Sequence, residues 1–250
     1  MYDLVCVLPL YGKNCKDVSL RMISSLAIQK TSYKVKYMFY YDDTVDNDAL
    51  NQITFLMSGR YIEYEIIHSE KTCSGHKRNL GLRYAEKNAK YVWLLDQDDY
   101  LEYEDTIGVV LGYCLEKDLN LLKLPFRTPG YLDKQNTKII HNIPTMPWQY
   151  IVRTDLLDEI AFKEDNEYGS DIPYSIKLLV KTGYAVINED LSIHYLKFPS
   201  TCSIPMYYYN YLNKNSYMGN YVKFNNNDML VQQEYGKNEL RKIKEEYENN

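Results

Sequence analysis

The stretch Tyr91-Val92-Trp93-Leu94-Leu95-Asp96-Gln97-Asp98-Asp99-Tyr100-Leu101 decides the fold. Its first five residues are apolar, as in a short buried strand, and the strand runs directly into an acidic cluster. In an open parallel sheet, ligands bind beyond the carboxyl ends of the strands. Two carboxylates with the spacing of Asp96 and Asp98 can provide the oxygen ligands that Mg²⁺ and Mn²⁺ prefer. For such a pair alone, an acidic turn exposed to solvent is the alternative.

The chain around this stretch alternates between strand and helix patterns. Apolar runs of strand length precede it and follow it, and the segments between them carry apolar residues at helical spacing, such as Val18, Met22 and Leu26. This order predicts a mainly parallel α/β sheet flanked by helices. The expected strands are residues 4–10, 35–41, 62–67, 91–95 and 119–124, and the expected helices lie around residues 18–26, 50–57, 75–89 and 107–115.

From about Phe126 the alternation weakens. Pro129, Pro144 and Pro147 predict a loop or a short hairpin. A helix at residues 170–181 and strands at residues 185–187 and 193–196 are expected beyond it. The tail at residues 238–250 alternates Glu and Lys around apolar residues, which predicts an exposed amphipathic helix or a frayed end. We therefore expect one compact domain with a C-terminal helical appendage.

Composition narrows the functional class. The chain has 250 residues and a formal net charge of −5, which argues against a protein that holds nucleic acid mainly by its phosphates. No apolar run reaches the length of a membrane span, and the first residues do not resemble a signal peptide. The five scattered cysteines fit neither a disulfide framework nor a zinc site, so a cytoplasmic location is expected.

Unusual residues follow several of the expected strands. Pro9, Leu10 and Tyr11 end the first, Asp42 and Asp43 follow the second, His68 and Ser69 end the third, and the acidic cluster follows the fourth. Acids gathered at one edge of a sheet repel one another unless a cation or a donor-rich ligand is present. The pattern predicts a ligand site at that edge.

With these motifs in order, the sequence resembles the family 2 glycosyltransferases, which have a GT-A (Rossmann-like) fold. Resemblance covers roughly residues 1–203, with a nucleotide-sugar half at 1–101 and an acceptor half at 102–203, whereas the extension at 204–250 matches nothing in the family. Two positions depart from the pattern: the acidic second-strand end lacks its Gly, and Ser170 stands where the family has Glu. The matching segments are Val5–Tyr11, Asp42–Asp46, Lys77–Gly81, Leu95–Leu101, Phe162–Asp171 and Ile193–Ser200.

The resemblance implies roles on the donor side. Asp42 or Asp43 would hydrogen-bond the base, and Asp98 would bind the Mn²⁺ or Mg²⁺ ion, with Asp96 near the ribose or the metal. His194 would be a third metal ligand or a diphosphate contact, although a structural histidine is the commoner role for such a residue. The other donor-binding candidates are Pro9 and Tyr11 beside the base, Arg78 and Asn79 at the base or diphosphate, and Lys197 at a phosphate.

On the acceptor side, the resemblance implies inverting transfer to a hydroxyl group. Asp171 matches the position of the general base, although its local sequence alone favours a helix N-cap. Trp148 and Asp99 would contact the acceptor, and a place in the core is equally open for Trp148. A UDP-sugar is the commonest donor of the family. A glycan is the expected acceptor, and the acidic charge disfavours a nucleic-acid acceptor.

Two alternatives stay open at this stage. A sugar-nucleotide nucleotidyltransferase would also combine this fold class with a metal, but it would need a Gly-rich, Arg-containing loop after the first strand, where residues 10–14 offer one Gly and no Arg. A non-catalytic domain that binds a glycan or another partner would not need Asp96, Asp98 and Asp171 together.

Overall fold

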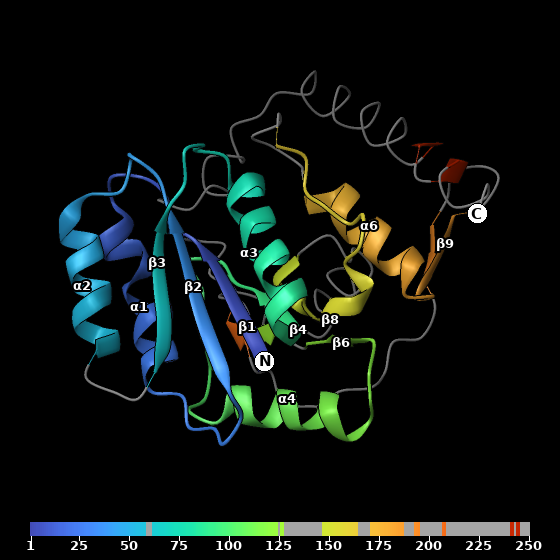
Figure 1. Ribbon diagram of the computed structural model, residues 1–250, viewed down its shortest axis with the longest axis horizontal. Helices are drawn as coiled ribbons and strands as arrows, with labels where there is room; N and C mark the ends of the chain where they lie inside the picture. Colours follow the sequence, from blue (N-terminus) through green and yellow to red (C-terminus); the bar gives the residue numbers. More distant parts are fainter. Residues whose placement is uncertain are drawn as a thin grey trace.

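A six-stranded mixed sheet runs through the middle of the protein (Figure 1). The computed structural model describes residues 1–58, 62–124, 126–127, 147–164, 171–187, 193–195, 207–208, 241–242 and 244–245. The strand order is β3-β2-β1-β4-β8-β6. These strands are β1 (Tyr2–Pro9), β2 (Val35–Tyr41), β3 (Glu63–His68), β4 (Ala89–Leu94), β6 (Leu121–Lys123) and β8 (Tyr150–Arg153).

The first four strands are parallel, so their carboxyl ends lie at one edge of the sheet. In this parallel part, β1 pairs with β2 and with β4, and β2 pairs with β3. Strand β8 then runs antiparallel to both β4 and β6. The order therefore places the ends of β1, β2 and β4, which carry the unusual residues, next to one another.

Helices cover both faces of the sheet. In Figure 1, α1 (Cys15–Ala27) and α2 (Asn47–Ser58) lie on one side and α3 (Ser74–Asn88) and α6 (Asp171–Lys181) on the other. A hydrophobic core lies on each face of the sheet, and the side chains of β1 alternate between the two. Leu4 packs in the core with α1 and α2, and Val5 packs in the core with α3 and α6. This two-sided burial explains why the parallel strands are apolar without interruption. Helix α4 (Thr106–Glu116) packs with the first cluster.

Helix α3 lies against β1 at close range. A Cβ atom at Gly81 would come within 2.3 Å of Val7, so a larger residue there would push the helix off the strand. This contact holds Arg78 and Asn79, three and two residues earlier in the same helix, near the carboxyl ends of the strands.

Two smaller sheets complete the described structure. Strands β9 (Ala185–Ile187) and β10 (Ile193–Tyr195) form an antiparallel pair. Strand β11 (Tyr207–Tyr208) lies between β5 (Tyr100–Leu101) and β7 (Phe126–Arg127), antiparallel to the first and parallel to the second. Two residues of the expected extension thus pair with the main domain, directly after the acidic cluster.

The expected mixed, mainly parallel sheet with flanking helices is confirmed, and three details are wrong. The loop or hairpin expected after Phe126 omitted β8, a four-residue strand inside the main sheet. A short 3₁₀ turn lies on each side of it, η1 (Pro147–Gln149) before and η2 (Thr154–Leu156) after. Ala89 begins β4 rather than ending α3, because the chain turns into the strand immediately after the helix. The strand expected at residues 119–124 is shorter, since Leu121 is its first paired residue.

Within the described ranges, no helix combines the length and the apolar character needed to cross a membrane. Most of residues 204–250 fall outside those ranges, and so the expected helical appendage stays a prediction.

Candidate active site

Arg78 joins two acidic residues at the carboxyl edge of the sheet. Its Nη2 donates a hydrogen bond of 2.5 Å to Asp96, just beyond β4, and its Nη1 donates one of 2.5 Å to Asp171, the first residue of α6. The Arg78 side chain is 6% exposed, whereas Asp171 keeps 40% of its side chain exposed. One guanidinium thus links Asp96 to the helix start that carries the predicted base.

The positive charge of Arg78 and the negative charges of Asp96 and Asp171 stabilise one another. Burial alone would lower the pKa of Arg78, but the carboxylates of Asp171 and Asp96 raise it above its ordinary value, so the guanidinium stays charged. Burial raises the pKa of Asp171, while the charge and hydrogen bond of Arg78 act against that rise. A carboxylate with a raised pKa and an exposed surface is a better proton acceptor than an ordinary surface aspartate.

Asp98 lies beside this group, and within the described part of the chain Arg78 pairs with Asp96 and Asp171 rather than with Asp98. Burial, and secondly the charge of Asp96, raises the pKa of Asp98 to about 7. A partly buried carboxylate with a raised pKa fits a position next to a cation.

The donor set also suits Mg²⁺ or Mn²⁺. Within the described ranges, no three His, Cys, Asp or Glu side chains gather into a group that could hold a metal ion. Asp96 and Asp98 would supply two hard oxygen ligands, and a diphosphate and water would complete the coordination, as is common for these ions. The residues present fit such a cation.

Asp42 is held in a buried network at the end of β2. Its Oδ2 accepts a hydrogen bond from Lys77 Nζ, and its Oδ1 accepts one from the Thr44 backbone N–H at 2.8 Å and one from the Thr44 hydroxyl. Lys77 Nζ also donates to the Leu10 carbonyl at 2.8 Å, and both charged side chains are almost completely buried. Burial lowers the pKa of Lys77, and the hydrogen bond and charge of Asp42 act in the opposite direction. Lys77 thereby ties the ends of β1 and β2 to α3.

Asp43, in contrast, projects into solvent. Its side chain is 94% exposed and its Oδ1 lies 2.8 Å from His68 Nε2, at the end of β3. The structure therefore separates the two acids that the sequence left as alternatives. Asp42 is engaged within the protein, and Asp43 is open to a ligand.

Tyr11 is fixed by Gln97, a residue within the acidic cluster. The Tyr11 backbone N–H donates to Gln97 Oε1 at 3.1 Å, and Gln97 Nε2 donates to the Tyr11 carbonyl at 3.1 Å. Lys77 Nζ lies 5.8 Å from the centre of the Tyr11 ring. Tyr11 is thus placed between the ends of β1 and β4, where the resemblance puts the nucleotide, and Pro9 ends β1 two residues earlier.

Asn79 has a structural role that the sequence did not suggest. Its side chain is buried, its Nδ2 donates to the Phe162 carbonyl at 2.9 Å and to Glu164 Oε1 at 3.0 Å, and its Oδ1 accepts the Phe162 N–H at 2.8 Å. All of these partners belong to the protein. Asn79 therefore fastens the segment before α6 to α3, and its expected contact with the nucleotide stays a prediction.

Trp148 and Asp99 lie in the interior. Trp148 is 2% exposed and its carbonyl accepts a hydrogen bond of 2.8 Å from Trp93 Nε1, which places it in the core. Asp99 is completely buried. In this arrangement neither side chain is available to an acceptor, and we propose no acceptor contact for them.

Other predicted residues cannot be placed in the site. The backbone of His194 belongs to β10, opposite Val186, but its side chain is outside the described structure. Lys197 lies outside the described residues, as do residues 165–170.

Sequence reasoning missed four residues of the site: Lys77, Thr44, Gln97 and Glu164. Each acts through a partner that is distant in sequence, or through its own backbone. In the sequence the start of α3 is a run of polar residues, so nothing marks Lys77 as the one that is completely buried.

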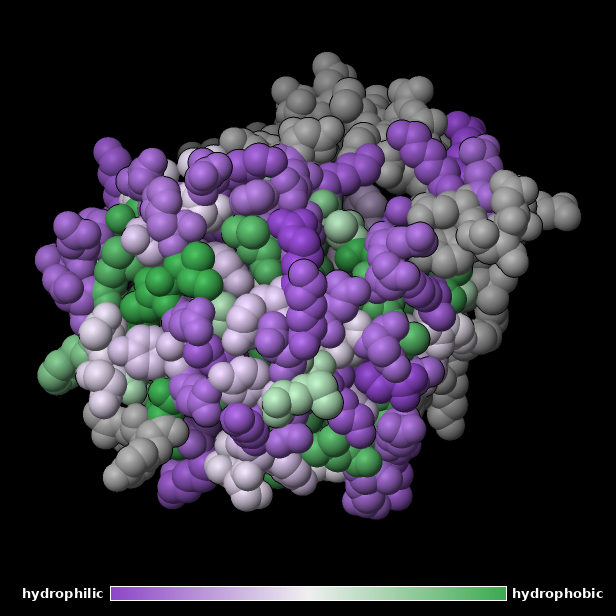
Figure 2. Space-filling model, viewed as in Figure 1, coloured by the Kyte–Doolittle hydropathy of each residue, from purple (hydrophilic) through white to green (hydrophobic). Residues whose placement is uncertain are grey.

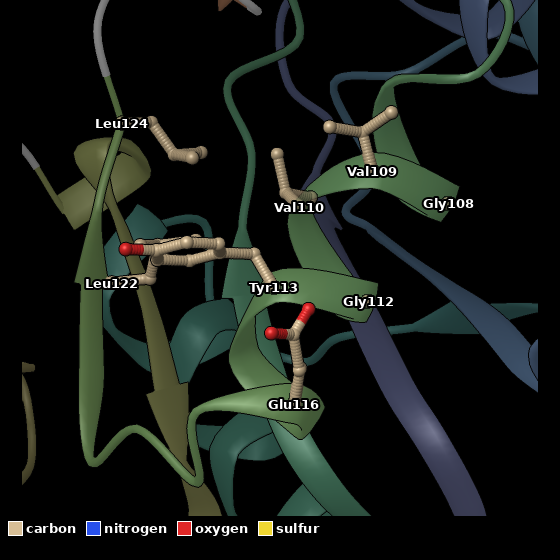
Figure 3. A pocket seen from close by; sticks show the side chains of 8 residues that line it. All are labelled: Gly108, Val109, Val110, Gly112, Tyr113, Glu116, Leu122 and Leu124. Carbon is tan, nitrogen blue, oxygen red and sulfur yellow. The ribbon is translucent and has the colours of Figure 1, made fainter. Parts of the chain in front are cut away.

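The described surface offers a separate cavity of about 300 Å³ between α4 and β6 (Figure 3). None of the predicted site residues lines this cavity. On the face seen in Figure 2, hydrophilic side chains cover most of the described part, and hydrophobic ones form separate smaller areas. The lining residues of the cavity are Gly108, Val109, Val110, Gly112, Tyr113, Glu116, Leu122 and Leu124.

Comparison with known proteins gives matches among solved structures alone. No family model matches the sequence, and no curated protein matches it. The structure is similar to S. aureus TarS 1-349 in complex with UDP-GlcNAc, at 17% identity and a TM-score of 0.64 over 87% of this chain and 60% of that one. The complex of TarS 1-349 with UDP gives 16% identity and a TM-score of 0.61 over 87% of this chain and 68% of that one.

A more distant match is the mannosyltransferase PcManGT from Pyrobaculum calidifontis in complex with GDP-Man and Mn²⁺. It gives 13% identity and a TM-score of 0.51 over 73% of this chain and 55% of that one. The chain spans 41% to 68% of the length of the TarS structures that it matches. At identities this low the structural likeness shows the fold alone, and that fold is GT-A-like.

Proposed function

We propose that the protein is a metal-dependent inverting glycosyltransferase of the family 2 type, which moves a sugar from a nucleoside diphosphate, UDP by preference, to a hydroxyl group on a glycan. The observation that carries this proposal is the bridge from Asp96 through Arg78 to Asp171. This bridge joins three predicted functional groups: the Arg78 guanidinium for the diphosphate, Asp96 for the metal ion and Asp171 as the base. They lie at the edge of the sheet where ligands bind in folds of this kind. The likeness to structures with bound UDP, UDP-GlcNAc and GDP-Man supports it.

The chemistry divides between the two ends of the bridge. Asp171, exposed toward solvent, accepts the proton of the acceptor hydroxyl as the oxygen attacks the anomeric carbon and the bond to the diphosphate breaks. Arg78 offers a fixed positive charge to the departing diphosphate. Asp96 and Asp98 would hold Mn²⁺ or Mg²⁺, whose contribution when bound is to neutralise the leaving group as a Lewis acid.

A panel of nucleotide sugars tests the proposal most directly. A ligand that binds the folded protein raises its melting temperature, so the donor should give the largest rise, and the rise should depend on Mn²⁺. The selected donor should then release its nucleoside diphosphate in the presence of the acceptor. Release of pyrophosphate from a nucleoside triphosphate and sugar phosphate would instead indicate a nucleotidyltransferase, and no binding of any nucleotide would indicate a non-catalytic domain.

Asp98→Asn should abolish the metal-dependent part of nucleotide binding. The amide removes the negative charge while keeping the size of the side chain, so the fold should be retained. Titration of UDP with and without Mn²⁺ measures the effect. The surface variant Asp118→Asn should behave like the wild type, and the assignment fails if Mn²⁺ still tightens UDP binding to Asp98→Asn.

Asp43→Ala and Asp42→Ala should give different results. Asp43 is exposed, so its loss should weaken uridine nucleotide binding by about tenfold with little change in melting temperature. Asp42→Ala should mainly destabilise the protein, because it leaves Lys77 buried without its partner. Thermal melts and UDP titrations of the two variants provide the comparison. Unchanged UDP affinity in Asp43→Ala would remove Asp43 from the base site.

A further inference from the structure

The carboxylate of Glu164 is a meeting point for side chains from two parts of the chain. Its Oε2 lies 2.7 Å from Lys71 Nζ and 2.8 Å from His76 Nδ1, and its Oε1 accepts from Asn79 Nδ2 at 3.0 Å. Arg83 adds a longer ion pair of 4.0 Å. The loop after β3 and the first turns of α3 are therefore joined to the segment that leads toward α6.

The backbone of the same segment is fixed to α3 as well. The Phe162 N–H and carbonyl both bond the Asn79 side chain, and Cys73 Sγ donates to the Glu164 carbonyl at 3.2 Å. At Gly75, a Cβ atom would come within 2.5 Å of the Lys163 carbonyl, so only glycine permits this approach. Residues 162–164 are therefore held against the start of α3 at several points.

Phe162 carries this attachment across to α6. Its ring stacks on Tyr174 with centres 3.9 Å apart and planes at 11°, and the Arg78 guanidinium lies 5.3 Å from the Phe162 ring centre. Tyr174 is one helical turn after Asp171. The layered arrangement of Arg78, Phe162 and Tyr174 therefore sets the distance between α3 and the start of α6.

Glu164 is unsuited to a direct chemical role. Its oxygens are occupied by protein donors, and its side chain is 26% exposed. Burial would raise its pKa, but the hydrogen bonds from Asn79, Lys71 and His76 outweigh burial and lower the pKa to about 2. A carboxylate this acidic stays charged and is a poor proton acceptor at neutral pH.

We propose that Glu164 is a positioning residue: by fastening residues 162–164 to α3, it holds the start of α6 so that Asp171 meets Arg78. The catalytic part of this statement rests on the proposed function, whereas the attachment of α6 does not. Small displacements of a catalytic group from its working position can reduce the rate strongly, so the attachment matters for turnover.

The test compares Glu164→Gln with Glu65→Gln. Glu65 also pairs with a lysine at 2.8 Å, but on β3, away from α6. Hydrogen exchange of the α6 amides should speed up by about fivefold or more in Glu164→Gln and stay unchanged in Glu65→Gln, with α2 unaffected in both. Lys71→Met removes one partner of the Glu164 carboxylate and should give a smaller increase in the exchange rate of the α6 amides. It provides a second test of the attachment if Glu164→Gln does not fold.

Kinetics provide the second readout. In Glu164→Gln, kcat should fall by about tenfold or more while the Kd for UDP with Mn²⁺ stays within about twofold, and the acid limb of the pH–rate profile should shift because Asp171 loses its fixed relation to Arg78. Unchanged α6 exchange in Glu164→Gln overturns the proposed attachment, and kcat equal to that of Glu65→Gln overturns its role in positioning Asp171. If the wild type transfers no sugar from any donor while α6 exchange still rises in Glu164→Gln, the proposed function fails and the attachment stands.

Discussion

Asp171→Asn should lower turnover by about a hundredfold or more, while the protein stays folded and binds its donor. The amide can still accept a hydrogen bond from Arg78 and can still begin α6, but it cannot take a proton at neutral pH. Because Asp171 is 40% exposed and Arg78 keeps Asp96 as a partner, the melting temperature should fall by only a few degrees. Single-turnover transfer, a thermal melt and UDP titration measure the three quantities.

Asp48→Asn is the matched control for this variant. Asp48 is likewise an acidic residue in the first turn of a helix and pairs with a basic side chain, but it lies on α2. Its turnover should equal that of the wild type. Near-normal transfer by Asp171→Asn would mean that Asp171 only begins the helix and pairs with Arg78, and the base would have to be sought elsewhere.

Lys77→Met should produce the largest loss of stability. The substitution fills most of the space, but it leaves the Asp42 carboxylate buried with Thr44 as its one remaining side-chain partner among the described residues. Removing one partner of a buried ion pair costs about 3–5 kcal/mol of unfolding free energy. For a chain of this length, such a loss lowers the melting temperature by about 10 °C. Calorimetry or circular dichroism melts provide the measurement.

The double variant Lys77→Met/Asp42→Asn separates charge from packing. Neutralising Asp42 removes the uncompensated charge and keeps an oxygen for Thr44, so part of the lost stability should return. Lys30→Met, which breaks an exposed pair with Glu104, should change the melting temperature by less than about 2 °C. If Lys77→Met melts like Lys30→Met, the buried pair contributes little and Asp42 is free to serve the ligand.

Local sequence patterns were enough to predict the strands and helices that are marked by their own apolar residues. Strand β2 begins and ends where its apolar run does, and α1 follows the spacing of Val18, Met22 and Leu26. Strand β8 was missed because it is short, its first three residues are buried on both faces, and a proline lies shortly before it, so that neither alternation nor length marks it as a strand. Its place between β4 and β6 depends on antiparallel pairing with strands distant in sequence.

The same division applies to the site. Placement of acids at strand ends follows from parallel strands, so Asp42, Asp96 and Asp98 could be proposed from the sequence. Their partners could not, because Arg78 meets Asp171 across 93 positions of the chain, and Asn79 meets Phe162 across 83. Which of Asp42 and Asp43 is buried could likewise not be decided from the sequence, since it depends on Lys77 reaching Asp42 from α3.

Strand β11 has a consequence for the order of folding. Tyr207 pairs with Leu101, roughly a hundred residues earlier in the chain, and it supplies the strand between β5 and β7. Contacts between such distant residues form late, since a large loop must close first. During synthesis, the six-stranded sheet can therefore assemble on the ribosome while β5 and β7, next to the acidic cluster, still have exposed edges. Unpaired edges invite association with other chains, and the nascent protein is exposed to that hazard until residue 207 has emerged.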